Sequence, residues 1–94
     1  MAMPFEWDDE KAEINLKKHK VNFQEAKSAF GDPFSITIDD PDHSKEEHRY
    51  IDIGKSDSGK LLVVVYTERG HKIRIISCRK ATPIERRKYE EQFS

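Results

Sequence analysis

Alternating apolar and polar positions dominate the middle and the second half of the chain, and this pattern predicts a sheet. The segment "FSITI" alternates in this way and leads into the acidic, turn-rich run "DDPDHSKEE". Three more apolar runs follow, "HRYIDIG", "KLLVVVY" and "KIRIISC", separated by the short glycine-containing connections "KSDSG" and "TERGH". Such spacing is typical of consecutive antiparallel hairpins. We therefore predict four strands in an antiparallel meander, with residues 61–65, apolar on both faces, in a central strand.

Helix signals flank this region on both sides. An extended start over residues 4–7 precedes a predicted helix of about three turns, with Asp8 as N-cap and the basic run 17–20 in its last turn. A second short helix is predicted from Asn22, which is spaced from Glu25 as in a capping box. Threonine, proline and glutamate at the cap, first and third positions of "TPIERRKYEEQF" predict a C-terminal helix. The fold class predicted is α+β: two N-terminal helices, a four-stranded antiparallel meander sheet and a C-terminal helix.

Length and composition limit the size of the core. The 94 residues suit a single domain over 1–94, and charged residues, at 37%, exceed the roughly 25% of an average domain. The core should therefore be small, and a partner chain would extend it. A single cysteine, Cys78, excludes an internal disulfide, and its apolar neighbours predict that it is buried. No apolar stretch approaches the length of a membrane span, so we predict a cytoplasmic protein with no membrane association.

Charge is unevenly distributed along the chain. The net charge is −1, yet residues 69–88 hold eight basic residues against one acidic residue, a local net charge of +7. Such a segment can form a positive field that attracts nucleic acid. Alternatively, folding brings acidic segments alongside and cancels that field. The sequence leaves both interpretations open.

Several classes of site have no support in the sequence. The histidines are scattered, no paired-cysteine motif occurs, and a solvated loop is the favoured interpretation of His43 among its neighbouring aspartates. There is no phosphate-binding glycine loop, no nucleophile elbow and no base partnered to Cys78. We therefore predict no metal and no cofactor.

Groups suited to phosphate remain. They are Lys18, His19, Arg49, Arg74, Ser77, Arg79 and Lys80. Arg86 and Arg87 are further RNA-backbone contacts, with solvating surface charges as the alternative. Tyr66 and Tyr89 are possible stacking surfaces, for which packing is the favoured interpretation. Strand alternation predicts Ser77 and Arg79 on one face and Arg74 on the other. Arg79 is favoured as a phosphate ligand because it lies just before the start of a helix. For Arg49, a salt bridge to Glu46 or Glu47 is an equal alternative.

Such a set suits RNA cleavage without a metal. In that reaction the ribose 2′-hydroxyl attacks the adjacent phosphorus, so the enzyme must accept one proton, donate another and stabilise charge on the phosphorane. Histidine is the natural proton carrier near neutral pH, and arginine is the natural charge stabiliser.

The chain resembles a known family. The segments "FEWDDEKAEINLKKHKVNFQEAKSAFGDP", "RYIDIGKSDSGKLLVVVYTERGHKIRIISCRKAT" and "ERRKYE" resemble, in order and spacing, the BrnT-type toxins of bacterial type II toxin–antitoxin systems. The most specific parts are the "W-D … N … K-H" pattern that ends at His19 and the "R-I-I-S-x-R-x-A" pattern over 74–81. The family usually has Gly where Lys20 stands and Ala where Cys78 stands.

The resemblance implies both a fold and an activity. It implies a RelE-like fold and an endoribonuclease that arrests translation. It also implies a cognate antitoxin with a DNA-binding region, which neutralises the toxin in a hetero-oligomer that represses its own operon. The active-site residues it implies are His19, Arg49, Ser77 and Arg79, with Lys18 and Glu47 as companions. Two alternatives from other classes are a non-catalytic module that binds RNA or the ribosome, for which the basic segment suffices, and a module that only binds a partner chain.

Overall fold

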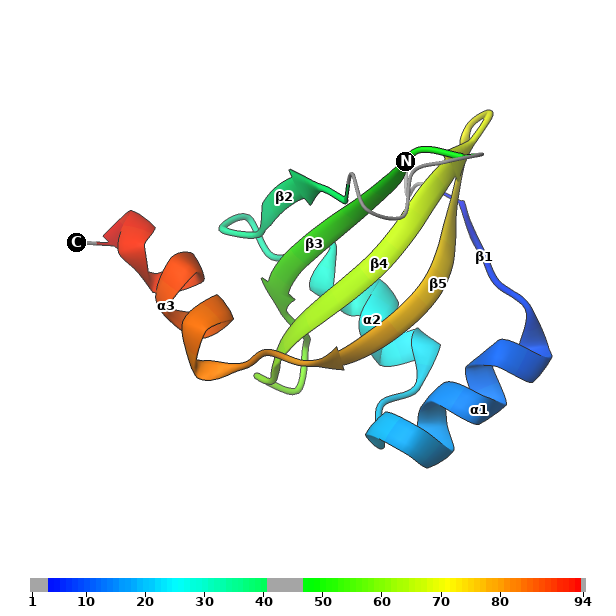
Figure 1. Ribbon diagram of the computed structural model, residues 1–94, viewed down its shortest axis with the longest axis horizontal. Helices are drawn as coiled ribbons and strands as arrows, with labels where there is room; N and C mark the ends of the chain where they lie inside the picture. The colour runs from blue at the N-terminus through cyan, green and yellow to red at the C-terminus, as the bar shows by residue number, and fades with distance from the viewer. Residues whose placement is uncertain (1–3, 41–46, 94) are drawn as a thin grey trace.

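The sheet forms the centre of the molecule. The computed structural model describes residues 4–40 and 47–93. In chain order the elements are β1 (Phe5–Glu6), α1 (Asp9–His19), α2 (Phe23–Ala29), β2 (Ile36–Asp39), β3 (Arg49–Lys55), β4 (Leu61–Arg69), β5 (Lys72–Lys80), α3 (Pro83–Glu90) and a 3-10 turn, η2 (Glu91–Phe93). The strand order is β1-β5-β4-β3-β2, with β4 central as predicted (Figure 1).

The predicted fold class is wrong in its sheet. The protein has a five-stranded mixed sheet, because β1 precedes the helices and pairs in parallel with β5. Phe5 lies opposite Ile73, and the Ile73 amide donates to the Pro4 carbonyl at 3.0 Å. A two-residue strand is too short to show alternation, so the sequence marked this segment only as extended.

The predicted helix starts are confirmed. One Asp8 carboxylate oxygen accepts hydrogen bonds from two amides of the first turn of α1, and the Asn22 side chain accepts one from the Glu25 amide. At α3 the Thr82 hydroxyl and the Glu85 carboxylate form a reciprocal capping box. These caps satisfy amides that the helices themselves leave unpaired.

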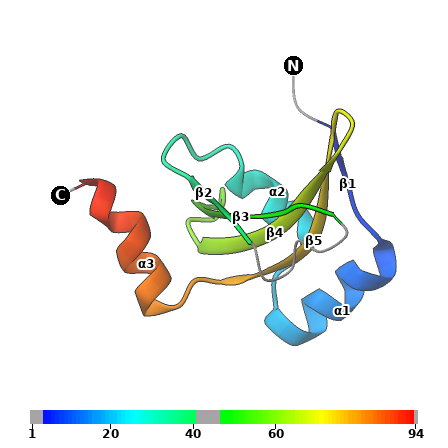
Figure 2. The ribbon, with the colours of Figure 1, turned by 45° about the horizontal axis from the view of Figure 1, so that its top comes forward.

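Helices cover the two faces of the sheet unequally. Helix α2 lies across one face, behind the sheet in Figure 1, where Phe23 and Ala26 pack with Leu62, Val64 and other buried residues into the main core. Helix α3 contacts the opposite face at one end only, through a single buried side chain, Tyr89. The two views show α3 projecting from the body of the molecule and α1 beside the β5 edge (Figures 1 and 2). Most of the face opposite α2 therefore carries no helix.

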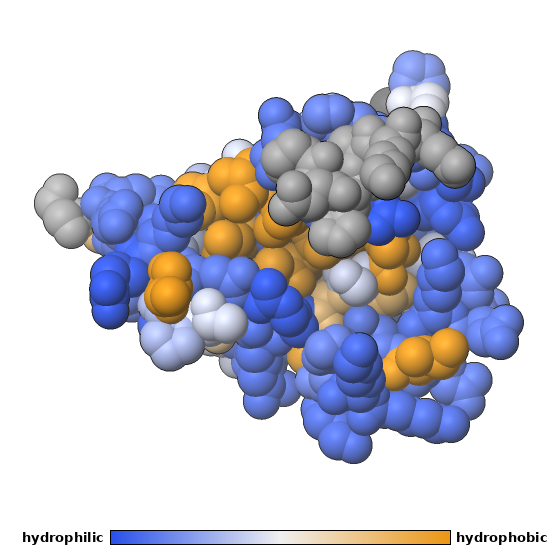
Figure 3. Space-filling model, viewed as in Figure 1, coloured by the Kyte–Doolittle hydropathy of each residue, from blue (hydrophilic) through white to orange (hydrophobic). Residues whose placement is uncertain are grey.

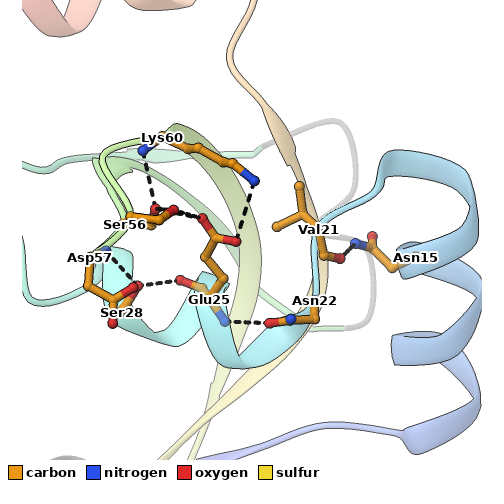
Figure 4. A network of polar contacts seen from close by, with 9 residues as sticks. Asn15, Val21, Asn22, Glu25, Ser28, Ser56, Asp57 and Lys60 are labelled. Carbon is orange, nitrogen blue, oxygen red and sulfur yellow. Dashed lines mark hydrogen bonds and ion pairs between the residues drawn. The ribbon is translucent and has the colours of Figure 1, made fainter.

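A half-buried carboxylate joins α2 to the connection between β3 and β4. Glu25 accepts hydrogen bonds from the hydroxyls of Ser56 and Ser58, and it forms an ion pair with Lys60 at 3.9 Å (Figure 4). These hydroxyl donors hold the pKa of Glu25 below its usual range. The charged form is thus the one that fixes the hairpin onto the helix.

A β-bulge changes the faces of β5. Val65 lies opposite Ser77, but the next residue of β4, Tyr66, lies opposite Ile75, so Ile76 is the extra residue. Ile75 and Cys78 consequently both point into the main core, although their separation is odd. The prediction that Arg74 and Arg79 occupy opposite faces is wrong for this reason, since uninterrupted alternation does not hold across a bulge.

Candidate active site

A groove lies between α1 and the edge of β5. It encloses about 200 Å³ and is lined by Lys11, Ile14, Asn15, Lys18, His19, Ile76 and Ser77. His19 is half-buried at the end of α1, and Lys18 beside it is exposed. The groove therefore brings together Lys18, His19 and Ser77, which are far apart in the sequence.

Asn15 holds α1 against β5. Its amide nitrogen donates to the carbonyls of Cys78 at 2.8 Å and Val21 at 3.0 Å, and its amide oxygen accepts from the Cys78 amide at 3.0 Å (Figure 4 draws the bond to Val21). The two bonds to Cys78 continue the β5 edge at a position beyond the short strand β1. His19 lies one helical turn after Asn15, so this buried side chain fixes the distance of His19 from Ser77.

The turn after His19 has an unusual backbone. Lys20 caps α1 with φ 62°, in the left-handed region that favours glycine, and its amide donates to the Leu16 carbonyl. A side chain in this conformation costs roughly 1 kcal/mol. Lysine at this position is therefore tolerated at some loss of stability.

Replacing Lys20 with glycine is expected to raise the free energy of unfolding by about 1 kcal/mol, because it removes the side-chain clash of the left-handed conformation. Urea denaturation of both chains measures the change. Lys17→Gly, in the helical interior of α1, is the matched control and should lower stability by about the same amount. Equal losses in both variants would contradict the interpretation of the Lys20 turn.

The face of the sheet opposite α2 carries three of the predicted residues on one strand. Arg74, Ser77 and Arg79 pair with Thr67, Val65 and Val63 of β4, so all three share the face away from α2. Arg49 shares this face because it pairs with the same Thr67, which places it about 10 Å from Arg74 at the usual strand spacing.

Half-buried apolar side chains occupy the middle of this face. Ile51 and Val65 are paired neighbours on β3 and β4, and neither is fully covered. Figure 3 shows apolar atoms gathered over the strands at the centre of the molecule, between the polar surfaces of α3 and α1. The middle of this face is thus apolar, and arginines of β3 and β5 border it.

Carboxylates neutralise much of the basic segment. Arg79 donates to both oxygens of Glu85 at 2.7 and 2.8 Å, Arg74 donates to Glu6 at 2.7 Å, and Arg69 donates twice to Glu47. The hydrogen bonds from Arg79 contribute most to holding the pKa of Glu85 at about 2. Of the two interpretations left open by the sequence, cancellation by other segments is confirmed for Arg74 and Arg69, whose partners Glu6 and Glu47 lie outside residues 69–88. Glu85 is the one acidic residue already counted in the net charge of +7.

The remaining predicted residues lie away from the groove. Lys80 pairs with Leu62 and so falls on the α2 face, opposite to Arg79. Arg86 and Arg87 are exposed on α3 and have no ion pair within the described residues.

Tyr66 and Tyr89 are buried, so the packing interpretation is confirmed for both. Glu47 is held by Arg69, while the alternative partner of Arg49, Glu46, lies outside the described residues.

No group of three metal-ligating side chains occurs within residues 4–40 and 47–93. His43, which the sequence placed in a solvated loop, lies outside these ranges. None of the described helices has the length and apolar character needed to cross a bilayer. Cys78 is fully buried as predicted, and burial raises the pKa of its thiol to about 12.

Sequence reasoning missed two residues that shape this region. Asn15 was part of a family pattern, but nothing in its local context indicated that it bonds to β5. Glu85 was identified only as a helix-capping residue, whereas its carboxylate also binds Arg79. An arginine six residues before a capping glutamate, across a strand-to-helix junction, is the signal that would have found this pair.

Comparison with known proteins places the chain in a family. Residues 7–85 match the family described as "Ribonuclease toxin, BrnT, of type II toxin-antitoxin system". Among solved structures, the 1.1 Å crystal structure of the Brucella abortus ribonuclease toxin BrnT superposes with a TM-score of 0.66, at 22% identity, over 85% of this chain and 97% of that one. That likeness shows a shared fold, and no curated protein gives a match. The family match spans most of the chain, and the protein therefore belongs to the BrnT family of ribonuclease toxins of type II toxin–antitoxin systems.

Proposed function

We propose that this protein is an endoribonuclease that cuts RNA without a metal and thereby inhibits translation. The observation that carries the proposal is the groove in which His19 and Ser77 meet, beside an arginine on the same strand face. Membership of the BrnT family supports the ribonuclease class.

Each residue has a role in the proposed reaction. The ribose 2′-oxygen bonds to phosphorus as the bond to the 5′-oxygen breaks, which leaves a cyclic phosphate and a 5′-hydroxyl. One proton leaves the 2′-oxygen and one reaches the 5′-oxygen, and His19 transfers one of them. Arg79 and Arg49 stabilise the charge that develops on the phosphoryl oxygens, and Ser77 and Lys18 position the backbone. Exposed Arg86 and Arg87, with Arg74 and Lys80, contact RNA phosphates farther from the cut.

We also propose that a cognate antitoxin with a DNA-binding region neutralises the protein in a hetero-oligomer in the cytoplasm. Type II toxin–antitoxin membership supports a protein partner. Exposed apolar side chains on α1 and α3, including Ile14 and Ile84, suit burial by such a chain.

Arg79→Ala tests the proposed activity. Induction of the wild-type chain should halt growth and degrade total RNA, and the purified protein should cut RNA in the presence of a chelator. The variant should cut on the order of tenfold to a hundredfold more slowly, because it lacks a donor to the transition-state charge. Exposed Lys72→Ala, on the same strand, is the control and should remain toxic. If Arg79→Ala is as toxic as the wild type and RNA stays intact in both, the ribonuclease proposal is wrong and a binding module is favoured.

A further inference from the structure

The Arg79–Glu85 pair determines how Arg79 can meet a phosphate. Glu85 accepts one hydrogen bond from each terminal nitrogen of Arg79, so it engages the end of the guanidinium. The Lys80 carbonyl lies 3.4 Å from Nη1. Of the five N–H donors of arginine, the Nε–H and the second Nη2–H remain, and both lie on the same edge of the group. Within the part of the chain that the structure describes, neither has an acceptor.

This open edge matches a phosphate group. Two parallel N–H donors on one side of a guanidinium fit two oxygens of a phosphate in a bidentate contact. The Arg79 side chain is 41% exposed, and its strand position directs it to the face that also carries Ser77. An anion can therefore approach Arg79 without displacing Glu85.

Glu85 is itself held rigidly. The same carboxylate oxygen that binds Arg79 Nη1 accepts the Thr82 amide at 2.9 Å, and the Glu85 amide donates to the Thr82 hydroxyl. Tyr89, the buried residue of α3, donates to Asp32 at 2.6 Å and anchors the helix to the body. The Thr82 cap thus holds the Glu85 carboxylate at the start of α3, and Tyr89 holds the other end of the helix.

We infer that Glu85 is a positioning residue for the ribonuclease site, which holds Arg79 so that its Nε–Nη2 edge faces the scissile phosphate. This inference rests on the proposed function. Glu85 neutralises the charge of Arg79, so it weakens the attraction of RNA, while its two hydrogen bonds orient the guanidinium. Its removal should therefore affect turnover and binding differently.

Glu85→Gln separates these effects. Glutamine keeps an oxygen for the Thr82 amide but loses the second charged contact to Arg79. We expect kcat for a short RNA substrate to fall about tenfold, while KM stays the same or falls because the site gains positive charge. Glu90→Gln, the same charge change at an exposed position of α3, should leave kcat unchanged. A rise in kcat for Glu85→Gln would show that Glu85 competes with phosphate, and an unchanged kcat would show a capping role only; either result overturns the inference.

A double-variant cycle provides the second test. In an Arg79→Ala background, Glu85→Gln should cause no further loss, whereas a purely structural role predicts that the two losses multiply. The Arg79 Nε–H resonance, followed by NMR while a 2′-deoxy oligonucleotide is added, should shift in the wild type and shift less in Glu85→Gln. This last measurement needs no cleavage. A wild type that does not cut RNA, with the NMR shifts as expected, would defeat the proposed function and leave the positioning role of Glu85 standing.

Discussion

Asn15→Ala is expected to lower the free energy of unfolding by about 3–4 kcal/mol. The change removes three hydrogen bonds and leaves the Cys78 amide, the Cys78 carbonyl and the Val21 carbonyl without their partner in a buried setting. Each unsatisfied buried group costs about 1–3 kcal/mol. Because Asn15 joins α1 to β5, the proposed RNA cleavage should also fall under conditions in which the variant is still folded.

Asn22→Ala is the matched control for this experiment. Asn22 is exposed and makes one capping bond to the Glu25 amide, so its loss should cost about 1 kcal/mol. Urea denaturation of the three chains at one pH gives both differences. Equal losses for the two asparagine variants would mean that the bonds of Asn15 to β5 add nothing to stability.

Asp52→Asn is expected to stabilise the protein at neutral pH. Asp52 is 2% exposed, and one of its oxygens has no hydrogen-bond partner within the described residues, while the other accepts from Thr37. Burial raises the pKa of Asp52 to about 6. The folded state therefore favours the neutral carboxyl, and as the pH rises from about 4 to above 6 the cost of the buried charge grows to roughly 3 kcal/mol.

Comparison of pH 4 with pH 7.5 isolates this cost. The stability gained by Asp52→Asn should be about 2 kcal/mol larger at pH 7.5 than at pH 4, where the aspartate is mostly neutral in the folded chain. Asp57→Asn, an exposed carboxylate in the next turn, should show no such difference between the two pH values. A pH-independent effect of Asp52→Asn would refute the raised pKa.

Local sequence determined the helix starts and the hairpin strands. Asp8, Asn22 and Thr82 were identified as caps because each bonds to amides within three residues of itself, so the sequence contains both partners. The central position of β4 was also predicted from local sequence, because residues 61–65 are apolar on both faces. The candidate site residues, a histidine with arginines and a serine, came from residue types together with the family resemblance, and their roles stay predictions.

Tertiary structure decided which of these groups meet. The parallel pairing of β1 with β5 joins residues 68 positions apart, and two residues carry no periodic signal of it. The bulge at Ile76 puts Arg74 and Arg79 on the same face, because one extra residue reverses the side chains after it relative to those before it. Asn15 and Glu85 gained their roles from partners across the fold. Local patterns specify elements through short-range bonds, whereas the site depends on register and on docking between elements, which only the packed chain fixes.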